Sequence, residues 1–227
     1  MSEQLGGSPE VSYFDYLESE HLDRRIVANL ETGIIERYSE SQRFYHTVEH
    51  LEEVVSFLLD RVDQLQNPRV VLWSAMYHDA VYDPALKGGE NERRSAALAE
   101  AELRGLLPDE EVDLIVSYVL ATITHENPNN DPDLALFLDS DMAILGSSSD
   151  RYSEYAGAIR HEYSVFSYEA YSSDQGRPAL LRMFRQRLLD GTLYQTQFVH
   201  QELFDQTLAN IDWELAQLES ATDPFLS

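Results

Sequence analysis

Apolar residues recur at steps of three and four along most of this 227-residue chain. Such spacing places them on one face of an α-helix, and we find no convincing two-residue alternation of the kind that is typical of a half-buried β-strand. The clearest stripe comprises Val48, Leu51, Val54, Val55, Leu58, Leu59 and Val62. The pattern therefore predicts an all-α protein.

The same periodicity, with proline and glycine as start and stop signals, indicates where the helices lie. We expect them at roughly 46–62, 68–81, 91–107, 109–126, 134–146, 150–166, 177–190 and 197–219. Because no internal repeat or interdomain linker interrupts them, we expect one compact helical bundle at 10–220, with a flexible N-terminus at 1–9 and a C-terminal tail at 221–227.

Composition limits the partners of the chain. No apolar run approaches the roughly 18 residues that a membrane span needs, and the first residues do not resemble a signal peptide, so a cytoplasmic protein without a membrane partner is expected. A formal net charge of −25 disfavours binding to nucleic acid polymers. Because the chain has no cysteine, any metal ion must be held by His, Asp or Glu.

Four titratable residues lie on or beside apolar helix faces. They are His50, the adjacent pair His78 and Asp79, and Asp141, and they belong to three separate predicted helices. A buried charged group is costly unless it is paired, hydrogen-bonded or bound to a metal. Two imidazoles and two carboxylates suit one divalent ion such as Mn, Mg, Co, Fe, Ni or Zn, although a helical histidine can equally be an ordinary core or surface residue.

The ordered set of a histidine, a His-Asp pair and a later aspartate resembles the signature of the HD superfamily of metal-dependent phosphohydrolases. The segments "RFYHTVEHLEEV", "YHDAVYD", "GGENERRSA", "FLDSDMAILG", "YAGAIRHEY" and "GRPALL" together look like one bacterial subfamily of predicted HD phosphohydrolases. The resemblance covers roughly residues 10–220, and its specificity comes from the combination.

The resemblance implies that the metal ligands are His50, His78, Asp79 and Asp141. Two alternatives stay open, because His46 could replace His50 and Asp139 could replace Asp141. The helix that follows His50 carries apolar residues at the expected steps, and the helical face favours Asp141 over Asp139.

Hydrolysis of a phosphate ester needs an activated water, a proton donor and cations for the phosphoryl oxygens. Asp79 is expected to orient the water, and His46 or His125 to donate the proton to the departing oxygen. The arginines nearest the motifs are candidate phosphate contacts, although each could instead pair with a carboxylate, and Glu92 is a candidate partner for one of them or for a ligand histidine. These candidates are Arg43, Arg93, Arg160, Arg177 and Glu92.

The sequence thus predicts a metal-dependent phosphohydrolase that acts on a small phosphorylated metabolite or nucleotide. A regulatory HD-fold protein that binds a ligand without turnover is the alternative, followed by a di-iron oxygenase. Between Asp79 and Asp141 the chain has a single histidine, His125, so we expect one tightly held ion and at most a weak second one. Tyrosines near the motifs are expected to pack with their hydroxyls at water, or else to line a pocket; they are Tyr45, Tyr77, Tyr82, Tyr155 and Tyr163.

Overall fold

Helices make up the whole regular structure of the described residues in a computed structural model of the chain, which describes residues 14–18, 22–219 and 222–225. The α-helices are α1 (Phe14–Leu17), α2 (Arg24–Tyr38), α3 (Val48–Leu59), α4 (Pro68–Tyr77), α5 (Glu90–Leu103), α6 (Asp109–Ala121), α7 (Pro132–Met142), α8 (Ser149–Glu162), α9 (Tyr168–Tyr171), α10 (Arg177–Leu189) and α11 (Gln197–Leu218). Short 3-10 turns lie at Val62–Gln64, Ala143–Gly146 and Tyr163–Val165. The predicted all-α bundle is confirmed.

Helix α4 lies at the centre of the N-terminal group of helices. It contacts α1, α2, α3, α5, α6 and α7, and every residue from Val70 to Tyr77 is buried. A helix that is apolar on all sides must be surrounded by other helices, which explains this position. Its start is fixed by Asn67, whose side chain accepts from the backbone N–H of Val70, and by Pro68 in the first turn.

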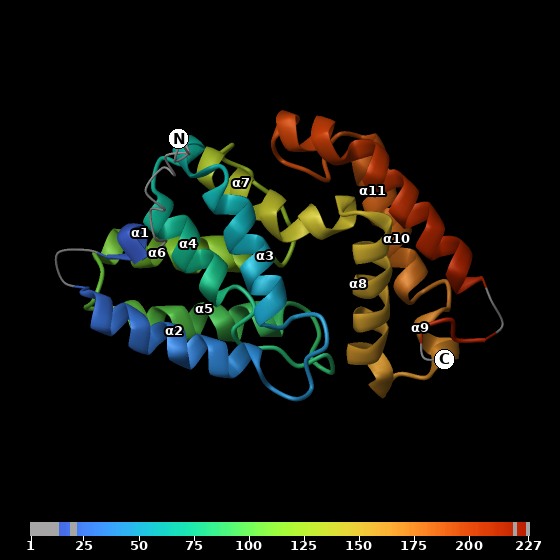
Figure 1. Ribbon diagram of the computed structural model, residues 1–227, viewed down its shortest axis with the longest axis horizontal. Helices are drawn as coiled ribbons and strands as arrows, with labels where there is room; N and C mark the ends of the chain where they lie inside the picture. The colour runs from blue at the N-terminus through green and yellow to red at the C-terminus, as the bar shows by residue number, and fades with distance from the viewer. Residues whose placement is uncertain (1–13, 19–21, 220–221, 226–227) are drawn as a thin grey trace, which may run out of the picture.

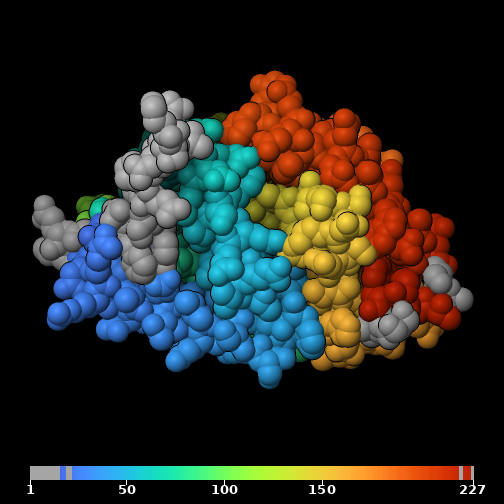
Figure 2. Space-filling model, viewed as in Figure 1, coloured from blue at the N-terminus to red at the C-terminus, as the bar shows by residue number. Residues whose placement is uncertain are grey.

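The second group consists of α8 to α11, and the 3-10 turn at 143–146 joins it to α7 (Figure 1). The side chain of Asn210 on α11 donates hydrogen bonds to the carbonyls of Leu145 and Ser147. One hydrophobic core runs from Leu17 to Leu218, through both groups. In Figure 2 the cyan atoms of α3 and the segment before it abut the yellow and orange atoms of α8.

Two predicted helices end earlier than expected. The helix expected at 68–81 ends at Tyr77, because the backbone N–H of Asp79 donates to the Tyr38 hydroxyl instead of to the carbonyl of Ala75, which lies against His78 Nδ1. The helix expected at 109–126 ends at Ala121, and His125 lies beyond it with a left-handed φ of 51°. As a result His78, Asp79 and His125, which were predicted to lie in helices, lie in turns just after α4 and α6.

Smaller corrections concern the other boundaries. The helix expected at 150–166 is α8 followed by a 3-10 turn, and the one expected at 134–146 is α7 followed by another. The segment expected as a flexible N-terminus lies outside the described residues. From the expected tail, Asp223 accepts a hydrogen bond from Arg160, and Phe225 contacts Trp213. Among the described residues, no helix combines the length and apolar character that a membrane crossing requires.

Candidate metal centre and cavity

Three mutually packed helices bring the four predicted ligands together. His50 lies in the first turn of α3 and is buried, His78 caps the C-terminus of α4, Asp79 follows it, and Asp141 lies in the last turn of α7. Each pair among α3, α4 and α7 is in contact. We call His50, His78, Asp79 and Asp141 the ligand cluster.

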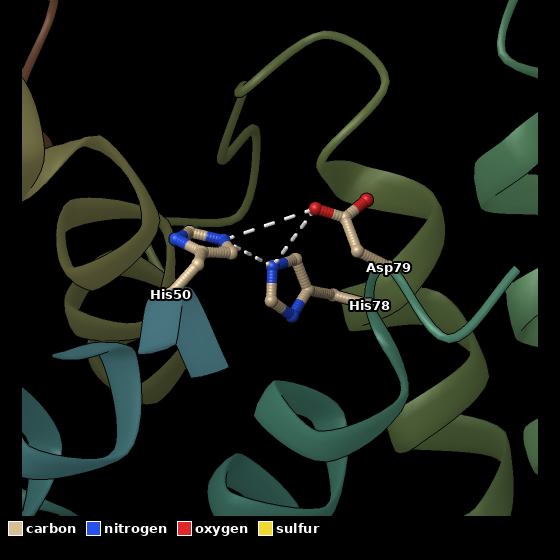
Figure 3. A group of neighbouring side chains, drawn as sticks. All are labelled: His50, His78 and Asp79. Atoms are coloured by element: carbon tan, nitrogen blue, oxygen red, sulfur yellow. Dashed lines mark hydrogen bonds and ion pairs between the residues drawn. The ribbon is translucent and has the colours of Figure 1, made fainter. Parts of the chain in front are cut away.

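The donor atoms of the ligand cluster lie close to one another, and Figure 3 shows those of His50, His78 and Asp79. His78 Nε2 lies 3.1 Å from His50 Nε2 and 3.3 Å from Asp79 Oδ2, and His50 Nε2 lies 3.8 Å from Asp79 Oδ2. Asp141 Oδ1 lies 3.5 Å from His50 Nε2 and 3.6 Å from His78 Nε2.

These separations match ligands that share an ion. Two donors each about 2.1 Å from one ion lie about 3.0 Å apart at a right angle and about 3.4 Å apart at the tetrahedral angle. The separations between the imidazole nitrogens and their neighbouring donors fall around those values. His50, His78 and Asp79 also form the one group of three or more His and Asp or Glu in the described residues whose donor atoms lie within 4.8 Å of one another. The residues present therefore fit a divalent ion.

The orientation of the His78 ring also suits a ligand. Its Nδ1 lies 2.7 Å from the carbonyl oxygen of Ala75, which can only accept, so Nδ1 carries the proton. Nε2 is then the unprotonated nitrogen of the neutral ring, and it faces the other donors. A backbone carbonyl that fixes the ring in this way is the usual partner of a metal-binding histidine.

The electrostatics of the cluster favour positive charge. Burial raises the pKa of Asp79, but the imidazoles of His78 and His46 outweigh burial and hold this pKa well below its usual range. Burial lowers the pKa of His78, whereas Asp79 and Asp141 raise it, and the balance brings it to about 9. A proton or a metal cation is therefore stabilised where the imidazoles and carboxylates meet.

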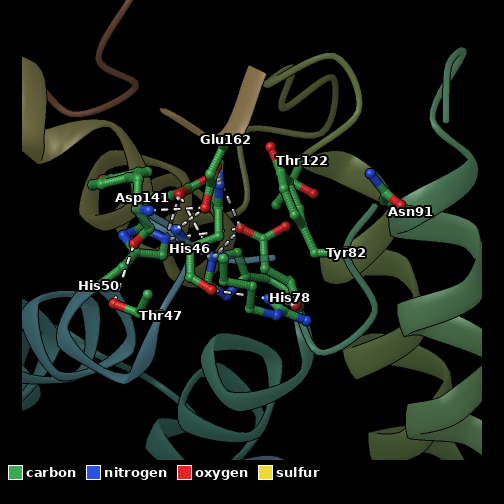
Figure 4. Close-up of polar contacts among 12 residues, drawn as sticks. His46, Thr47, His50, His78, Tyr82, Asn91, Thr122, Asp141 and Glu162 are labelled. Carbon is green, nitrogen blue, oxygen red and sulfur yellow. Dashed lines mark hydrogen bonds and ion pairs between the residues drawn. The ribbon is translucent and has the colours of Figure 1, made fainter. Parts of the chain in front are cut away.

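His46 lies beside the ligand cluster and is fixed by Glu162 at the end of α8. Glu162 Oε2 lies 2.7 Å from His46 Nδ1, while Oε1 accepts from the backbone N–H groups of Phe44, Tyr45 and His46, each at 2.8 Å (Figure 4). His46 Nε2 is 3.8 Å from Asp79 Oδ2. The structure thus places His50 among the ligand donors and His46 next to them, with its ring oriented by a carboxylate.

Glu162 was missed by the sequence analysis, although a signal for it existed. It follows Tyr155 and Ile159 at steps of four and three, on a face of α8 where all three side chains are buried. Burial raises its pKa, but His46 outweighs burial and lowers it. Like His50 and Asp141, Glu162 is a titratable group on an apolar helix face, which is the feature by which it could have been selected from the sequence.

His125 contacts the other oxygen of Asp141. Its Nε2 lies 3.0 Å from Asp141 Oδ2, so one carboxylate faces the two ligand histidines and His125. The backbone of His125 is held in its left-handed conformation by Arg187 Nη2 and Gln195 Nε2, which donate to its carbonyl at 2.8 and 3.2 Å. These two hydrogen bonds therefore stabilise the left-handed backbone at His125.

Asp139 lies apart from the ligand cluster. Its carboxylate accepts from the backbone N–H groups of Gln195 and Thr196 and from the Thr196 hydroxyl, which joins α7 to the start of α11. Burial raises its pKa to about 6. Of the two predicted alternatives, the structure places Asp141 at the cluster and gives Asp139 a structural partner.

Arg43 and Arg160 have protein partners. Arg43 donates to the carbonyls of His46, Asp79 and Ala80, so it fixes the backbone on both sides of the ligand cluster. Arg160 pairs with Asp223 at 2.8 Å. Neither of these predicted phosphate contacts lines the large cavity described next.

The other predicted substrate contacts lie in or near the cavity wall. Arg93, which is outside the wall, donates to the carbonyl of Gly88. Arg177 lines the cavity, but its guanidinium pairs with Glu214 and donates to Tyr155. Glu92 lines the cavity too.

A cavity of about 750 Å³ opens beside the ligand cluster, between the two groups of helices. His46, Asp79, His125 and Asp141 contribute to one end of its wall. A smaller cavity of about 310 Å³ also reaches His50 and Asp141. A pocket of several hundred Å³ with a few converging polar groups is typical of a small-molecule site.

Comparisons of the chain with protein-family models, with curated proteins and with solved structures give no match. What the protein does must therefore be inferred from the ligand cluster and the cavity beside it.

Proposed function

We propose that this protein is a metal-dependent phosphohydrolase of the HD superfamily that acts on a small phosphorylated compound. The observation that carries the proposal is the convergence of two imidazole nitrogens and two carboxylates, from three helices, at the edge of a large cavity. The order of these residues along the chain is the one that resembles the superfamily.

His50, His78, Asp79 and Asp141 would hold the ion. Their mixed nitrogen and oxygen donors suit Mn, Fe, Co, Ni or Zn, with Mg as the harder alternative. When bound, a divalent ion supplies a Lewis acid for the phosphoryl oxygens and lowers the pKa of a bound water.

The residues around the cluster supply orientation and protons. Asp79 is 13% exposed at its side chain and lines the cavity, so its carboxylate can accept a hydrogen bond from the attacking water. His46 lines the cavity as well, and Glu162 holds its Nδ1 so that Nε2 is left to carry a proton to the departing oxygen. His125, on Asp141, is the second candidate for this transfer.

One ion per chain fits the ligands better than two. A second ion beside the cluster would find two additional imidazoles, His125 on Asp141 and His46, and the Nδ1 of His46 is already held by Glu162. Such a site would rely on water or substrate oxygens and bind weakly. The proposal is therefore hydrolysis at one ion, and oxygen chemistry at an iron pair has no second set of ligands to support it.

The test is phosphate release from a broad panel of phosphomonoesters, nucleotides and cyclic nucleotides, with added Mn²⁺, Co²⁺ or Mg²⁺. We expect turnover of at least one compound by the wild-type protein and by His200→Ala, and none by His78→Ala. His200 serves as the control because it lies on α11, outside both cavities. A tight complex with a phosphorylated compound and no phosphate release would instead support the regulatory alternative.

A further inference from the structure

The His46 ring is confined by three neighbours. Its Nδ1 lies 2.7 Å from the carboxylate of Glu162. The ring of Tyr82 stacks on its face, with the ring centroids 4.1 Å apart and an angle of 25° between the planes, and the ring of Tyr45 packs against it at 75° and 4.8 Å (Figure 4). Its other nitrogen, Nε2, lies 3.8 Å from Asp79 Oδ2, and His46 and Asp79 both line the large cavity. The three contacts therefore leave Nε2 as the free nitrogen, on the side of the ligand cluster.

Tyr82 belongs to the loop between α4 and α5, and α5 holds this loop on both sides of it. Before Tyr82, the Ser95 hydroxyl accepts from the backbone N–H of Val81 at 3.0 Å and lies 3.3 Å from the carbonyl of the same residue. After Tyr82, the Asn91 side chain accepts from the backbone N–H of Asp83 at 3.0 Å and donates to its carbonyl at 3.1 Å. Side chains one turn apart on α5 thus fix the backbone that carries the Tyr82 ring.

The ring of Tyr82, and not its hydroxyl, acts on His46. The hydroxyl lies 3.5 Å from that of Tyr163, which is too long for a strong hydrogen bond. A hydrogen bond at Nδ1 alone leaves the imidazole free to tilt about that bond, whereas an aromatic ring stacked on its face opposes the tilt. The two contacts together specify one orientation of the His46 ring.

We propose that Tyr82 is a positioning residue for His46, and that Asn91 and Ser95 hold Tyr82 in place. Its ring keeps the imidazole in the orientation in which Nε2 can pass a proton to the departing oxygen. The proton transfer rests on the proposed function, whereas the stacking of the two rings depends on neither ion nor substrate. The assignment gives the "NERRS" segment of α5 a part in the site, through its first and last residues.

The first test observes the His46 ring without any turnover. An imidazole N–H that is bonded to a carboxylate and screened from water gives a downfield proton resonance that exchanges slowly. We expect such a resonance from His46 Nδ1–H in the wild-type protein, identified by its loss in His46→Gln. It should be kept in Tyr82→Phe and lost in Tyr82→Leu. Its persistence in Tyr82→Leu, or its absence from the wild-type spectrum, would overturn the proposal.

The second test compares two departing groups. An alkoxide needs a proton as it leaves, whereas p-nitrophenolate leaves without one. Tyr82→Leu should therefore lower kcat for an alkyl phosphate about tenfold more than kcat for p-nitrophenyl phosphate, with the metal content unchanged. The conservative variant Tyr82→Phe should restore both rates. Equal losses with the two esters in Tyr82→Leu would overturn the proposal, because a general loss of folded protein lowers both alike.

Two further variants separate positioning from stability. Ser95→Ala removes a fully buried hydroxyl that cannot contact a substrate, and it should give a smaller selective loss in the same direction even if Tyr82→Leu does not fold. The matched control is Tyr118→Leu, because Tyr118 is also buried and stacks on Phe137 but lies outside both cavities. It should lower the melting temperature and keep both the resonance and the ratio of the two kcat values. A selective loss in Tyr118→Leu would contradict the assigned role.

Separate outcomes distinguish this inference from the proposed function. If the resonance depends on the Tyr82 ring while the wild-type protein hydrolyses no ester, the positioning contact stands and the phosphohydrolase proposal fails. If the wild-type protein hydrolyses both esters and Tyr82→Leu slows them equally, the phosphohydrolase proposal stands and the role of Tyr82 fails.

Discussion

Two clusters of buried charge lie on helix faces in this protein, and they differ in how well their atoms are paired. In the closed cluster, formed by Arg177, Glu214, Tyr152 and Tyr155, the hydrogen bonds are 2.7–3.1 Å long. In the ligand cluster, the carboxylate oxygens lie 3.3–3.8 Å from the ligand imidazole nitrogens. Charge-assisted hydrogen bonds are about 2.7–2.9 Å long, so the closed cluster is complete and the ligand cluster has room for a cation.

The closed cluster therefore has a structural role, whereas the ligand cluster is suited to binding. A paired, hydrogen-bonded charge group stabilises the fold as it stands, and the removal of one member leaves a buried charge without a partner. A set of converging donors held apart by their helices is stabilised instead by what binds among them.

Glu214→Ala should lower the free energy of unfolding by about 3–5 kcal/mol, because it leaves the Arg177 guanidinium buried and unpaired. Urea unfolding of the purified variant measures this loss. The same variant should bind as much Mn²⁺ as the wild-type protein, since Glu214 contacts no residue of the ligand cluster. Loss of the ion from this variant would show that the two clusters are coupled.

A divalent ion should stabilise the wild-type protein and fail to stabilise Asp141→Asn. At a free ion concentration 100 times the dissociation constant, the wild-type protein should gain about 2.7 kcal/mol in the free energy of unfolding. Asp139→Asn is the matched control, two residues away with the same chemical change, and it should keep the ion-dependent gain. If Asp139→Asn loses the gain and Asp141→Asn keeps it, the two aspartates have been assigned in the wrong order.

Glu162→Gln should reduce turnover about 10- to 100-fold while one ion stays bound, because it removes the carboxylate that orients His46. A glutamine can still accept from the backbone N–H groups of residues 44–46, so the fold should be kept. Steady-state kinetics and metal analysis of the same preparation measure both quantities. Loss of the ion would make His46 a ligand rather than a proton donor.

His125→Ala should reduce turnover about tenfold and leave one ion bound per chain. The expected loss is small because His125 contacts the ligand Asp141 and is not itself a ligand. The left-handed backbone at this position is an additional constraint, so His125→Asn provides a second variant that tolerates it. A variant without its ion would place His125 among the ligands.

The class of fold and most of the ligand cluster could be predicted from the sequence. His50 and Asp141 are found because a helix repeats every 3.6 residues, so a charged residue in an apolar stripe is visible in the sequence. The last two helices were predicted to within one residue, since their stripes end at clear breaks.

What could not be predicted depends on contacts between distant segments. The Tyr38 hydroxyl, 41 residues away, accepts the backbone N–H of Asp79 and so ends α4 early, and no local pattern encodes this contact. The contact of Glu162 with His46 spans 116 residues.

The most direct test of the account is the metal content of the purified protein after incubation with Mn²⁺, Co²⁺ or Zn²⁺ and removal of the excess ion. Elemental analysis should find one ion per chain in the wild-type protein and in His200→Ala, and none in His78→Ala, which loses the Nε2 atom closest to the other donors. A wild-type protein that retains no ion, or a His78→Ala variant that retains as much as the wild-type protein, would contradict the assignment of His50, His78, Asp79 and Asp141 as the ligands.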